Sequence, residues 1–214
     1  MRRRIAGIIG FFFAIASVGA QPAAAEMQTA IFAGGCFWCV EADFDHVPGV
    51  LSTTSGYTGG STQNPTYDDY SAGGHREAVK IEFDDSQVTY DHLLDVFFHS
   101  VDPTDDGGQF CDRGQSYTTA VYVLDDAQKE AAEKAKKTAE AELGQALVTP
   151  VLPAATFWPA EDYHQDYYKS EGRILSRFGY VTKADAYQGY REGCGRDARL
   201  RAVWGDSALR GVKK

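Results

Sequence analysis

The sequence predicts an α+β fold with a ferredoxin-like core of order β-α-β-β-α-β, extended by further helices and a strand into a mixed sheet. Three observations lead to this prediction. Strand-like and helix-like runs follow one another in that order along residues 28–152. The chain has 214 residues, enough for one domain with a sizeable core. No internal repeat or linker divides it. We therefore expect a single domain.

The first half of the predicted core surrounds a Gly-Gly-Cys turn. Residues 28–33 have the composition of a short buried strand, residues 40–44 that of a helix, and residues 50–57 that of a strand rich in β-branched side chains. Turn residues separate this strand from the next. Residues 77–83 alternate between polar and apolar side chains, which predicts a half-buried strand with Glu77 near its start.

The second half of the core begins with a helix that Thr89 is expected to cap. After a loop rich in Asp and Gly, residues 117–124 are predicted to form a strand. Asp125 or Asp126 then caps a long helix of mostly solvated surface. Residues 148–152 are expected to form an edge strand because they contain a proline.

The remaining chain is less regular in pattern. Pro159 is expected to begin a helix that contains the aromatic residues Tyr163, His164, Tyr167 and Tyr168. From about residue 185 the chain is polar, and we expect a flexible tail that carries Cys194 between two glycines.

Residues 1–25 are predicted to form a secretory signal peptide. Three arginines precede an apolar run of about 14 residues, and three alanines then offer a cleavage site near Ala25–Glu26. The run is short for a membrane span of about 20 residues, and an uncleaved N-terminal anchor is the alternative. We expect an exported protein, periplasmic or secreted, whose mature catalytic domain is residues 26–214. No stable membrane association is expected after cleavage.

The charge balance excludes some partners. Removing the three arginines of residues 1–25 from the formal net charge of −9 leaves −12 for the mature chain. An acidic protein repels phosphate backbones, so nucleic-acid binding is not expected. Four cysteines in an exported chain allow three disulfide pairings, but a chain of this length does not need them in place of a core. We expect a monomer.

Cys36 is the candidate nucleophile. It lies where a strand turns into a helix, and a helix N-terminus stabilises a thiolate through its free amides and its dipole. Gly34 and Gly35 permit a tight turn and a close approach of a ligand. Phe37 and Trp38 place aromatic rings beside the sulfur. The alternative is a buried structural cysteine or half of a structural disulfide.

A series of blocks in this chain resembles the peptide methionine sulfoxide reductase A family. The blocks run in order from about residue 30 to residue 168, and their number and order make the resemblance specific. They are Gly-Gly-Cys-Phe-Trp-Cys at 34–39 with Glu41, Gly-Tyr-Thr-Gly-Gly at 56–60, Asn-Pro-Thr-Tyr at 64–67, Gly-His-Arg-Glu-Ala-Val at 74–79, Asp-Pro-Thr at 102–104, Asp-Arg-Gly at 112–114 followed by Tyr117, and Pro-Ala-Glu-Asp-Tyr-His-Gln at 159–165.

The resemblance implies thiol-dependent reduction of methionine S-sulfoxide, protein-bound or free, and hence repair of oxidised proteins. Cys36 would attack the sulfoxide sulfur and become a sulfenic acid, while Glu77 protonates the leaving oxygen. Tyr57 and Tyr117 match phenol donors to that oxygen. The substrate-binding positions are Phe37 and Trp38, which would hold the S-methyl group, and Asp112.

A second thiol must then resolve the sulfenic acid as a disulfide, which an external dithiol such as a thioredoxin-like protein would reduce. Cys194 is the favoured resolving residue, and Cys111 and Cys39 are the alternatives. No metal or organic cofactor is implied. The chain departs from the family pattern at Val101, at Thr118-Thr119, in a short loop after Tyr67, around Cys111-Asp112 and in its tail, none of which changes the nucleophile or the acid.

Other functions remain open on the residues alone. The first is a thioredoxin-like exported disulfide exchanger that uses Cys36 and Cys39. The second is a binding domain without enzymatic activity, stabilised by disulfides. A zinc site is the weakest, because one Cys-x-x-Cys pair supplies half of the ligands.

Overall fold

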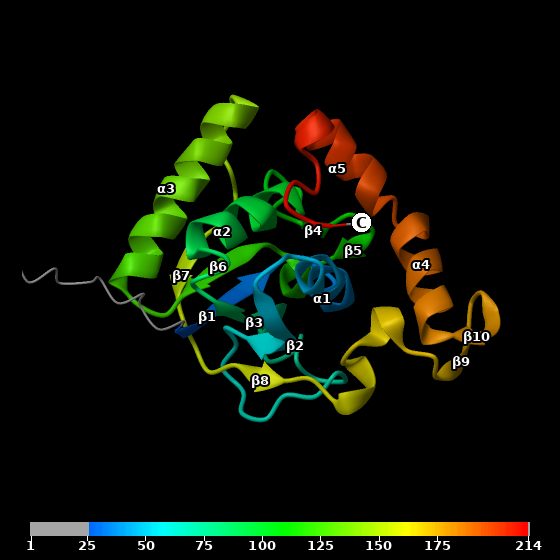
Figure 1. Cartoon of the computed structure of the whole chain (residues 1–214). Helices are drawn as coiled ribbons and strands as arrows, with labels where there is room; N and C mark the ends of the chain where they lie inside the picture. Colours follow the sequence, from blue (N-terminus) through cyan, green and yellow to red (C-terminus); the bar gives the residue numbers. More distant parts are fainter. Residues whose placement is uncertain (1–25, 214) are drawn as a thin grey trace, which may run out of the picture.

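The computed structural model describes residues 26–213, so the predicted signal peptide lies outside the described residues. The core is a six-stranded sheet of order β7-β6-β1-β3-β2-β8 (Figure 1). The strands in chain order are β1 (Met27–Ala33), β2 (Val50–Thr58), β3 (Arg76–Asp84), β6 (Ala120–Val123), β7 (Val151–Pro153) and β8 (Trp158–Pro159). All neighbouring pairs are antiparallel except β6 and β7, so the predicted α+β class and mixed sheet are confirmed.

Three helices cover one face of this sheet. They are α1 (Phe37–Asp45), α2 (Tyr90–His99) and α3 (Asp126–Leu143). Between them and the sheet lies the main hydrophobic core, with Phe32 of β1 and Ile81 of β3 fully buried at its centre. Residues one position away, such as Ile31, belong to a smaller cluster on the opposite face, as strand alternation requires.

The predicted helix caps are confirmed. The Thr89 hydroxyl accepts the amide of His92 at 3.2 Å at the start of α2. Of the two candidates at the start of α3, Asp125 is the cap, and its carboxylate accepts the amide of Gln128 at 2.7 Å. No helix among the described residues is long and apolar enough to cross a membrane.

The strand predicted over residues 117–124 begins later than expected. Tyr117 ends a 3₁₀ turn, η1 (Gln115–Tyr117), and β6 begins only at Ala120. Thr118 closes the turn, because its hydroxyl and its amide both donate to the Gln115 carbonyl, at 2.7 and 3.1 Å. These local bonds hold Tyr117 in a turn although its β-propensity favours a strand.

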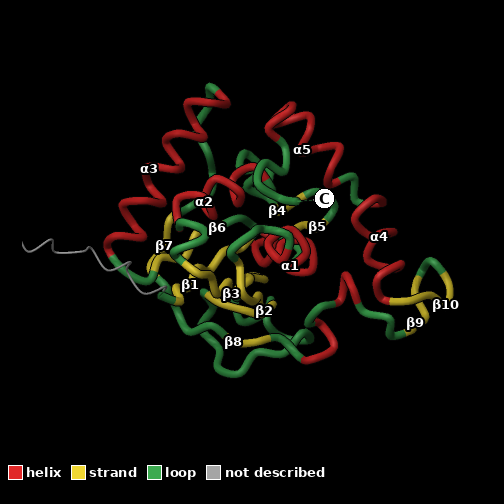
Figure 2. Tube along the Cα trace, viewed as in Figure 1, coloured by secondary structure: helices red, strands yellow, loops and turns green. Residues whose placement is uncertain are grey.

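The aromatic helix predicted after Pro159 is wrong. Pro159 ends the short strand β8, and two 3₁₀ turns follow, η2 (Asp162–His164) and η3 (Tyr167–Lys169), within a stretch that Figure 2 shows mostly as loop. Gln165 separates the turns, because its side chain accepts the amide of Ser55 at 2.9 Å and donates to the Ser55 carbonyl at 3.0 Å. Asp166 then has a left-handed backbone, which a continuous helix excludes.

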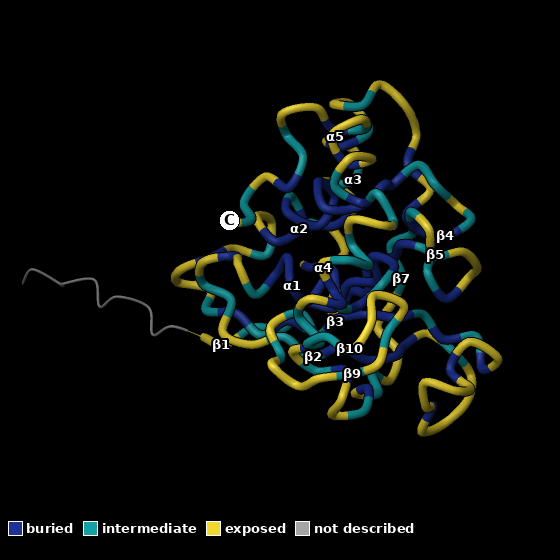
Figure 3. Tube along the Cα trace, turned by 90° about the vertical axis from the view of Figure 1, so that its right-hand side faces the viewer, coloured by how far each residue is buried: buried dark blue, intermediate teal, exposed yellow. Residues whose placement is uncertain are grey.

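The flexible tail predicted from about residue 185 is also wrong. The hairpin of β9 (Arg173–Ser176) and β10 (Gly179–Thr182) leads into two helices, α4 (Lys183–Gly193) and α5 (Arg196–Trp204). Figure 3 shows the hairpin as exposed or half-buried, whereas the buried segments gather at the sheet and α1. The helices hide few apolar residues, so a hydrophobic pattern does not reveal them.

A buried arginine anchors α5 to the core. Arg196 is 1% exposed, and its guanidinium donates to the carbonyls of Ser100 at 2.8 Å and Gly34 at 3.3 Å. It also lies 4.6 Å from the centroid of the Phe110 ring and 3.9 Å from a carboxylate oxygen of Asp43. These contacts tie the end of the chain to the turn that precedes Cys36.

We predict that Arg196→Met lowers the free energy of unfolding by about 2–4 kcal/mol, because two buried carbonyls lose their charged donor. The matched control is Arg201→Met, since Arg201 is exposed on the same helix and its loss should change stability by less than about 0.5 kcal/mol. Urea unfolding of both variants measures the difference. Equal stabilities would contradict the anchoring role.

Candidate active site

Cys36 lies at the turn between β1 and α1, as predicted. It is the N-cap residue of α1, and its carbonyl accepts the amides of Cys39 at 3.0 Å and Val40 at 3.3 Å. The turn requires glycine, because Gly35 has φ +82° and a Cβ there would lie 2.6 Å from the Cβ of Gln109. The partly exposed Cys36 thiol borders a cavity of about 350 Å³. The turn therefore presents the sulfur to a site of small-ligand size.

Glu77 lies against the same turn. Its carboxylate accepts the Phe37 amide on Oε2 at 2.9 Å and the Tyr70 hydroxyl on Oε1 at 2.9 Å. The side chain is buried, and this burial raises the pKa of Glu77 to about 8, although the two donors lower it. The negative charge of Asp112 adds to the rise. At neutral pH Glu77 is therefore mostly a protonated acid that borders the cavity.

The two free cysteines, Cys36 and Cys39, are hydrogen-bonded to each other. A hydrogen bond between the side chains of Cys36 and Cys39 raises the pKa of Cys36 well above its usual value, and burial and nearby carboxylates add to the rise. The same bond lowers the pKa of Cys39 to about 7, helped by the positive charges of Arg196 and Arg191. The directions of the two shifts favour a thiolate at Cys39 over one at Cys36. The helix N-terminus was expected to stabilise a thiolate at Cys36, whereas the hydrogen bond with Cys39 and burial shift the pKa of Cys36 in the opposite direction.

Tyr57 does not direct its hydroxyl to the cavity. It pairs with Glu77 across β2 and β3, and its ring is buried, but its hydroxyl donates to Glu161 Oε2 at 2.9 Å. The other oxygen of Glu161 accepts the amide of Tyr67 at 2.9 Å. Tyr67, and not Tyr57, lines the cavity. Tyr57 acts on the site indirectly, by orienting the carboxylate that holds Tyr67.

Tyr117 and Asp112 lie where the sequence analysis expected them, at the cavity wall. Burial raises the pKa of Tyr117 to about 12, so its phenol stays protonated and can donate. Burial also raises the pKa of Asp112. The Tyr117 hydroxyl lies 3.1 Å from that of Tyr70, which links it to Glu77.

Phe37 and Trp38 supply the apolar part of the wall. Phe37 is fully buried, and the Trp38 ring stacks on Tyr167 with centroids 3.8 Å apart. The two rings lie 6.2 Å apart at an interplanar angle of 41°. This surface suits a small apolar group such as an S-methyl.

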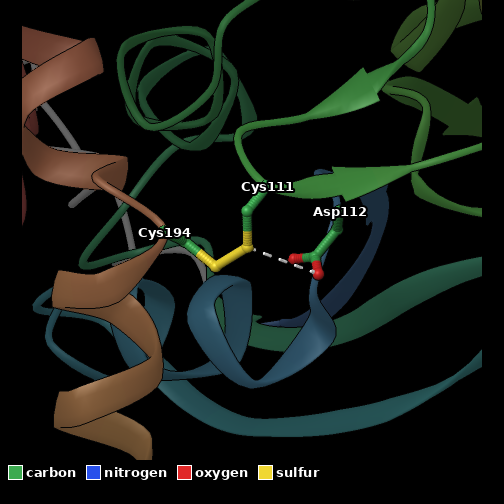
Figure 4. The surroundings of a disulfide bond; sticks show 3 residues. All are labelled: Cys111, Asp112 and Cys194. Carbon is green, nitrogen blue, oxygen red and sulfur yellow. Dashed lines mark hydrogen bonds between the residues drawn. A yellow bond between two sulfur atoms is a disulfide. The ribbon is translucent and has the colours of Figure 1, made fainter.

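Cys111 and Cys194 form a disulfide that borders the same cavity (Figure 4). Cys111 lies in the hairpin of β4 (Gly108–Gln109) and β5 (Asp112–Arg113), and Cys194 caps the C-terminus of α4. The structure therefore pairs Cys194 with Cys111 and leaves Cys36 and Cys39 free.

A metal site at this disulfide is not supported. Cys111, Asp112 and Cys194 place potential ligand atoms within 4.8 Å of one another, and Asp112 Oδ1 lies 3.8 Å from Cys111 Sγ. The sulfur–sulfur bond removes the two thiolates that zinc would need. The three residues therefore do not fit zinc while the disulfide is present.

Sequence reasoning missed two tyrosines of the site, Tyr67 and Tyr70, and two arginines of the cavity wall, Arg191 and Arg196. Tyr67 had a signal, because it ends the Asn-Pro-Thr-Tyr block at 64–67. Tyr70 had none, because it lies in a turn-rich stretch without a pattern of its own.

Comparisons with known proteins agree with this site. Residues 28–193 match the family described as peptide methionine sulfoxide reductase. A relative of that name from Rhizobium meliloti, MsrA 2, is 56% identical over 88% of this chain and 89% of its own length. A Bacillus licheniformis protein named peptide methionine sulfoxide reductase MsrA is 44% identical over 85% of this chain and 96% of its own length.

Solved structures give the same result. Methionine sulfoxide reductase A of Corynebacterium diphtheriae is 31% identical, with a TM-score of 0.59 over 69% of this chain and 75% of its own. Reduced Mxr1 from Saccharomyces cerevisiae shares the fold, with a TM-score of 0.63 over 78% of this chain and 97% of its own at 23% identity. Because the family match spans most of the chain and includes every residue of the cavity wall discussed above except Cys194 and Arg196, this chain belongs to the peptide methionine sulfoxide reductase family.

Proposed function

We propose that this protein reduces methionine S-sulfoxide, free or in oxidised proteins, to methionine. The observation that carries the proposal is the contact between the Cys36 turn and a buried, protonated Glu77 at one apolar cavity. A sulfoxide oxygen leaves only when it is protonated, so a nucleophilic sulfur and an acid must act on the same substrate group. Family membership supports the same reaction.

Each wall of the cavity has a role in the proposed reaction. The S-methyl group would lie on Phe37 and Trp38, and the sulfoxide oxygen would face Glu77 and the phenols of Tyr67 and Tyr117. Attack by Cys36 Sγ on the sulfoxide sulfur transfers the oxygen, so Cys36 becomes a sulfenic acid and methionine is released. The Cys39 thiolate, hydrogen-bonded to Cys36, is placed to accept the thiol proton.

Recycling would then use the pair at the mouth of the site. The Cys194 thiol condenses with the Cys36 sulfenic acid, which forms a Cys36–Cys194 disulfide and releases water. Cys111 next attacks the Cys194 sulfur, which frees the Cys36 thiol and forms the observed Cys111–Cys194 bond. Cys111 is exposed, so an external dithiol, such as a thioredoxin-like protein, can reach this bond. Cys39 is the alternative resolving thiol because it already contacts Cys36.

Single-turnover chemistry tests the function. We expect the protein with its Cys111–Cys194 bond intact to release about one methionine per chain from an S-sulfoxide peptide without added reductant. Prior reduction of all four cysteines should allow a second equivalent, because the freed Cys36 can react again. Cys36→Ser should release none. The Cys111→Ser variant should stop at the Cys36–Cys194 disulfide, which peptide mass mapping can detect. A Cys36–Cys39 disulfide in that variant would reject this recycling order. Failure of the wild type to release methionine would reject the function.

The pH dependence of the same reaction follows from the acid and from Cys39. Glu77 must carry its proton, and its pKa is raised to about 8, whereas Cys39 must have lost its proton, and its pKa is lowered to about 7. The single-turnover rate should therefore be highest between pH 7 and pH 8, fall as pH drops below 7, and fall as pH rises through 8. Glu77→Gln keeps the side-chain shape but supplies no acid. We expect it to lower the rate by roughly 10²–10⁴-fold and to abolish the fall near pH 8. A Gln variant with the wild-type rate would remove Glu77 from the mechanism.

The thioredoxin-like disulfide exchanger is not favoured. Its chemistry needs only Cys36 and Cys39, and it gives no role to the buried Glu77 or the phenols beside it. The family match also points to sulfoxide reduction.

We also propose that the protein is exported and that residues 1–25 are removed, on the charge and hydropathy pattern of that segment alone. N-terminal sequencing of the protein recovered outside the cytoplasm should begin at Glu26; a chain that begins at Met1 would contradict this. A ferredoxin-like unit formed by β6-β1-β3-β2 with α1 and α2 is likewise a proposal, supported by the strand order and the antiparallel pairing.

A further inference from the structure

A tyrosine behind the cavity wall connects two of the groups that line the cavity. The Tyr70 hydroxyl lies 2.9 Å from Glu77 Oε1 and 3.1 Å from the Tyr117 hydroxyl. Glu77 and Tyr117 line the cavity, whereas Tyr70 does not and is only 5% exposed. Tyr70 therefore acts on a substrate only through these two neighbours.

The loop between β2 and β3 holds the Tyr70 ring in place. The ring stacks on Tyr57 with centroids 4.7 Å apart and on Tyr67 at 5.8 Å. The Tyr70 amide donates to the Thr66 carbonyl at 2.9 Å, and the Tyr70 carbonyl accepts the amide of His75 at 3.0 Å. With ring and backbone both held, the hydroxyl stays between its two partners.

The number of hydrogens on Glu77, Tyr70 and Tyr117 determines which group donates in each of the two hydrogen bonds that join them. Phe37 donates its amide to Glu77 Oε2, so the acid proton of a neutral Glu77 belongs on Oε1 and points to the Tyr70 oxygen. A phenol has one hydrogen, and Tyr70 must then donate it to the oxygen of Tyr117. The hydrogen of Tyr117 is left free to point into the cavity. When Glu77 is ionised, Tyr70 donates to Oε1 instead, and Tyr117 can donate back to Tyr70.

We propose that Tyr70 is a positioning residue that couples the protonation of Glu77 to the direction of the Tyr117 hydroxyl. The phenol donor faces the sulfoxide oxygen when the acid holds its proton and turns away when the acid is ionised. This proposal rests on the proposed function. Tyr70 would thus take part in the reaction although it touches neither the substrate nor Cys36.

With this role for Tyr70, the pH profile of the single-turnover rate depends on the Tyr70 hydroxyl. A hydroxyl that donates to a carboxylate stabilises the ionised form, so this bond lowers the pKa of Glu77. The other titratable groups around Glu77 are Cys36, which caps α1, Cys39 of α1, Tyr57 of β2, Tyr67 of the β2–β3 loop, Asp112 of β5 and Tyr117 of η1. Tyr70→Phe keeps the ring that stacks on Tyr57 and Tyr67, so we expect it to leave all of these groups in place.

The test is Tyr70→Phe in single-turnover methionine formation across pH. We expect the rate near pH 7 to fall about tenfold and the decline near pH 8 to move upward by about one unit, because the carboxylate loses a donor. Site-specific 3-fluorotyrosine at position 70, a stronger donor, should move the decline downward. Tyr117→Phe should slow the wild type but have little further effect on Tyr70→Phe, because Tyr117 is no longer directed.

Tyr90→Phe is the matched control. The Tyr90 hydroxyl is buried and has no hydrogen-bond partner among the described residues, and Tyr90 lies outside the cavity. Its loss should leave the pH profile unchanged. An infrared titration of the protonated Glu77 carboxyl in wild type and Tyr70→Phe needs no turnover, so it tests the coupling even if the enzyme assay fails. Unchanged titration and an unchanged pH profile in Tyr70→Phe would overturn the proposal.

Discussion

The site depends on one hydrogen bond, from the Phe37 amide to the Glu77 carboxyl. Phe37 is the first residue of α1, so its amide is one of the free donors at the helix N-terminus, and Glu77 lies at the start of β3, 40 positions later. The bond satisfies a buried donor and a buried acceptor together, since leaving either unpaired would cost about 1–3 kcal/mol. The acid is thereby fixed beside the residue that follows the nucleophile.

The sheet order makes this contact possible. Strand β3 lies between β1 and β2, so its first residues come beside the end of β1 where the Cys36 turn begins. The C-terminal helices then cover the other side of the turn. Arg196 binds the Gly34 carbonyl, and Cys194, two residues earlier, closes a disulfide with the β4–β5 hairpin. Residues 34–36 and 194–196, far apart in the sequence, thus meet at one turn.

Sequence patterns predicted the parts of the site whose cause is local. The Gly-Gly-Cys turn and the alternation of β3 were sufficient to place Cys36 and Glu77 correctly. The hydroxyl of Tyr57 was not predictable, because its partner Glu161 lies 104 positions away. The helices α4 and α5 were not predicted for another reason. A buried arginine and a disulfide hold them against the core, and neither helix needs an apolar stripe that a sequence pattern would reveal. Long-range polar contacts leave no periodic signal in a sequence.

Burial favours the protonated form of both the acid Glu77 and the nucleophile Cys36, which helps the acid and hinders the nucleophile. Burial keeps Glu77 protonated near neutral pH, which the leaving oxygen needs, but the hydrogen bond with Cys39 and then burial raise the pKa of Cys36 and oppose a thiolate there. The structure separates the two demands by one helical turn. Cys39, one turn into α1, is the thiol whose pKa is lowered to about 7, and the guanidinium groups of Arg191 and Arg196 favour its negative charge. The site can therefore hold a neutral acid at the cavity and, one turn into α1, a thiolate that is ready to take the proton of Cys36 when substrate arrives.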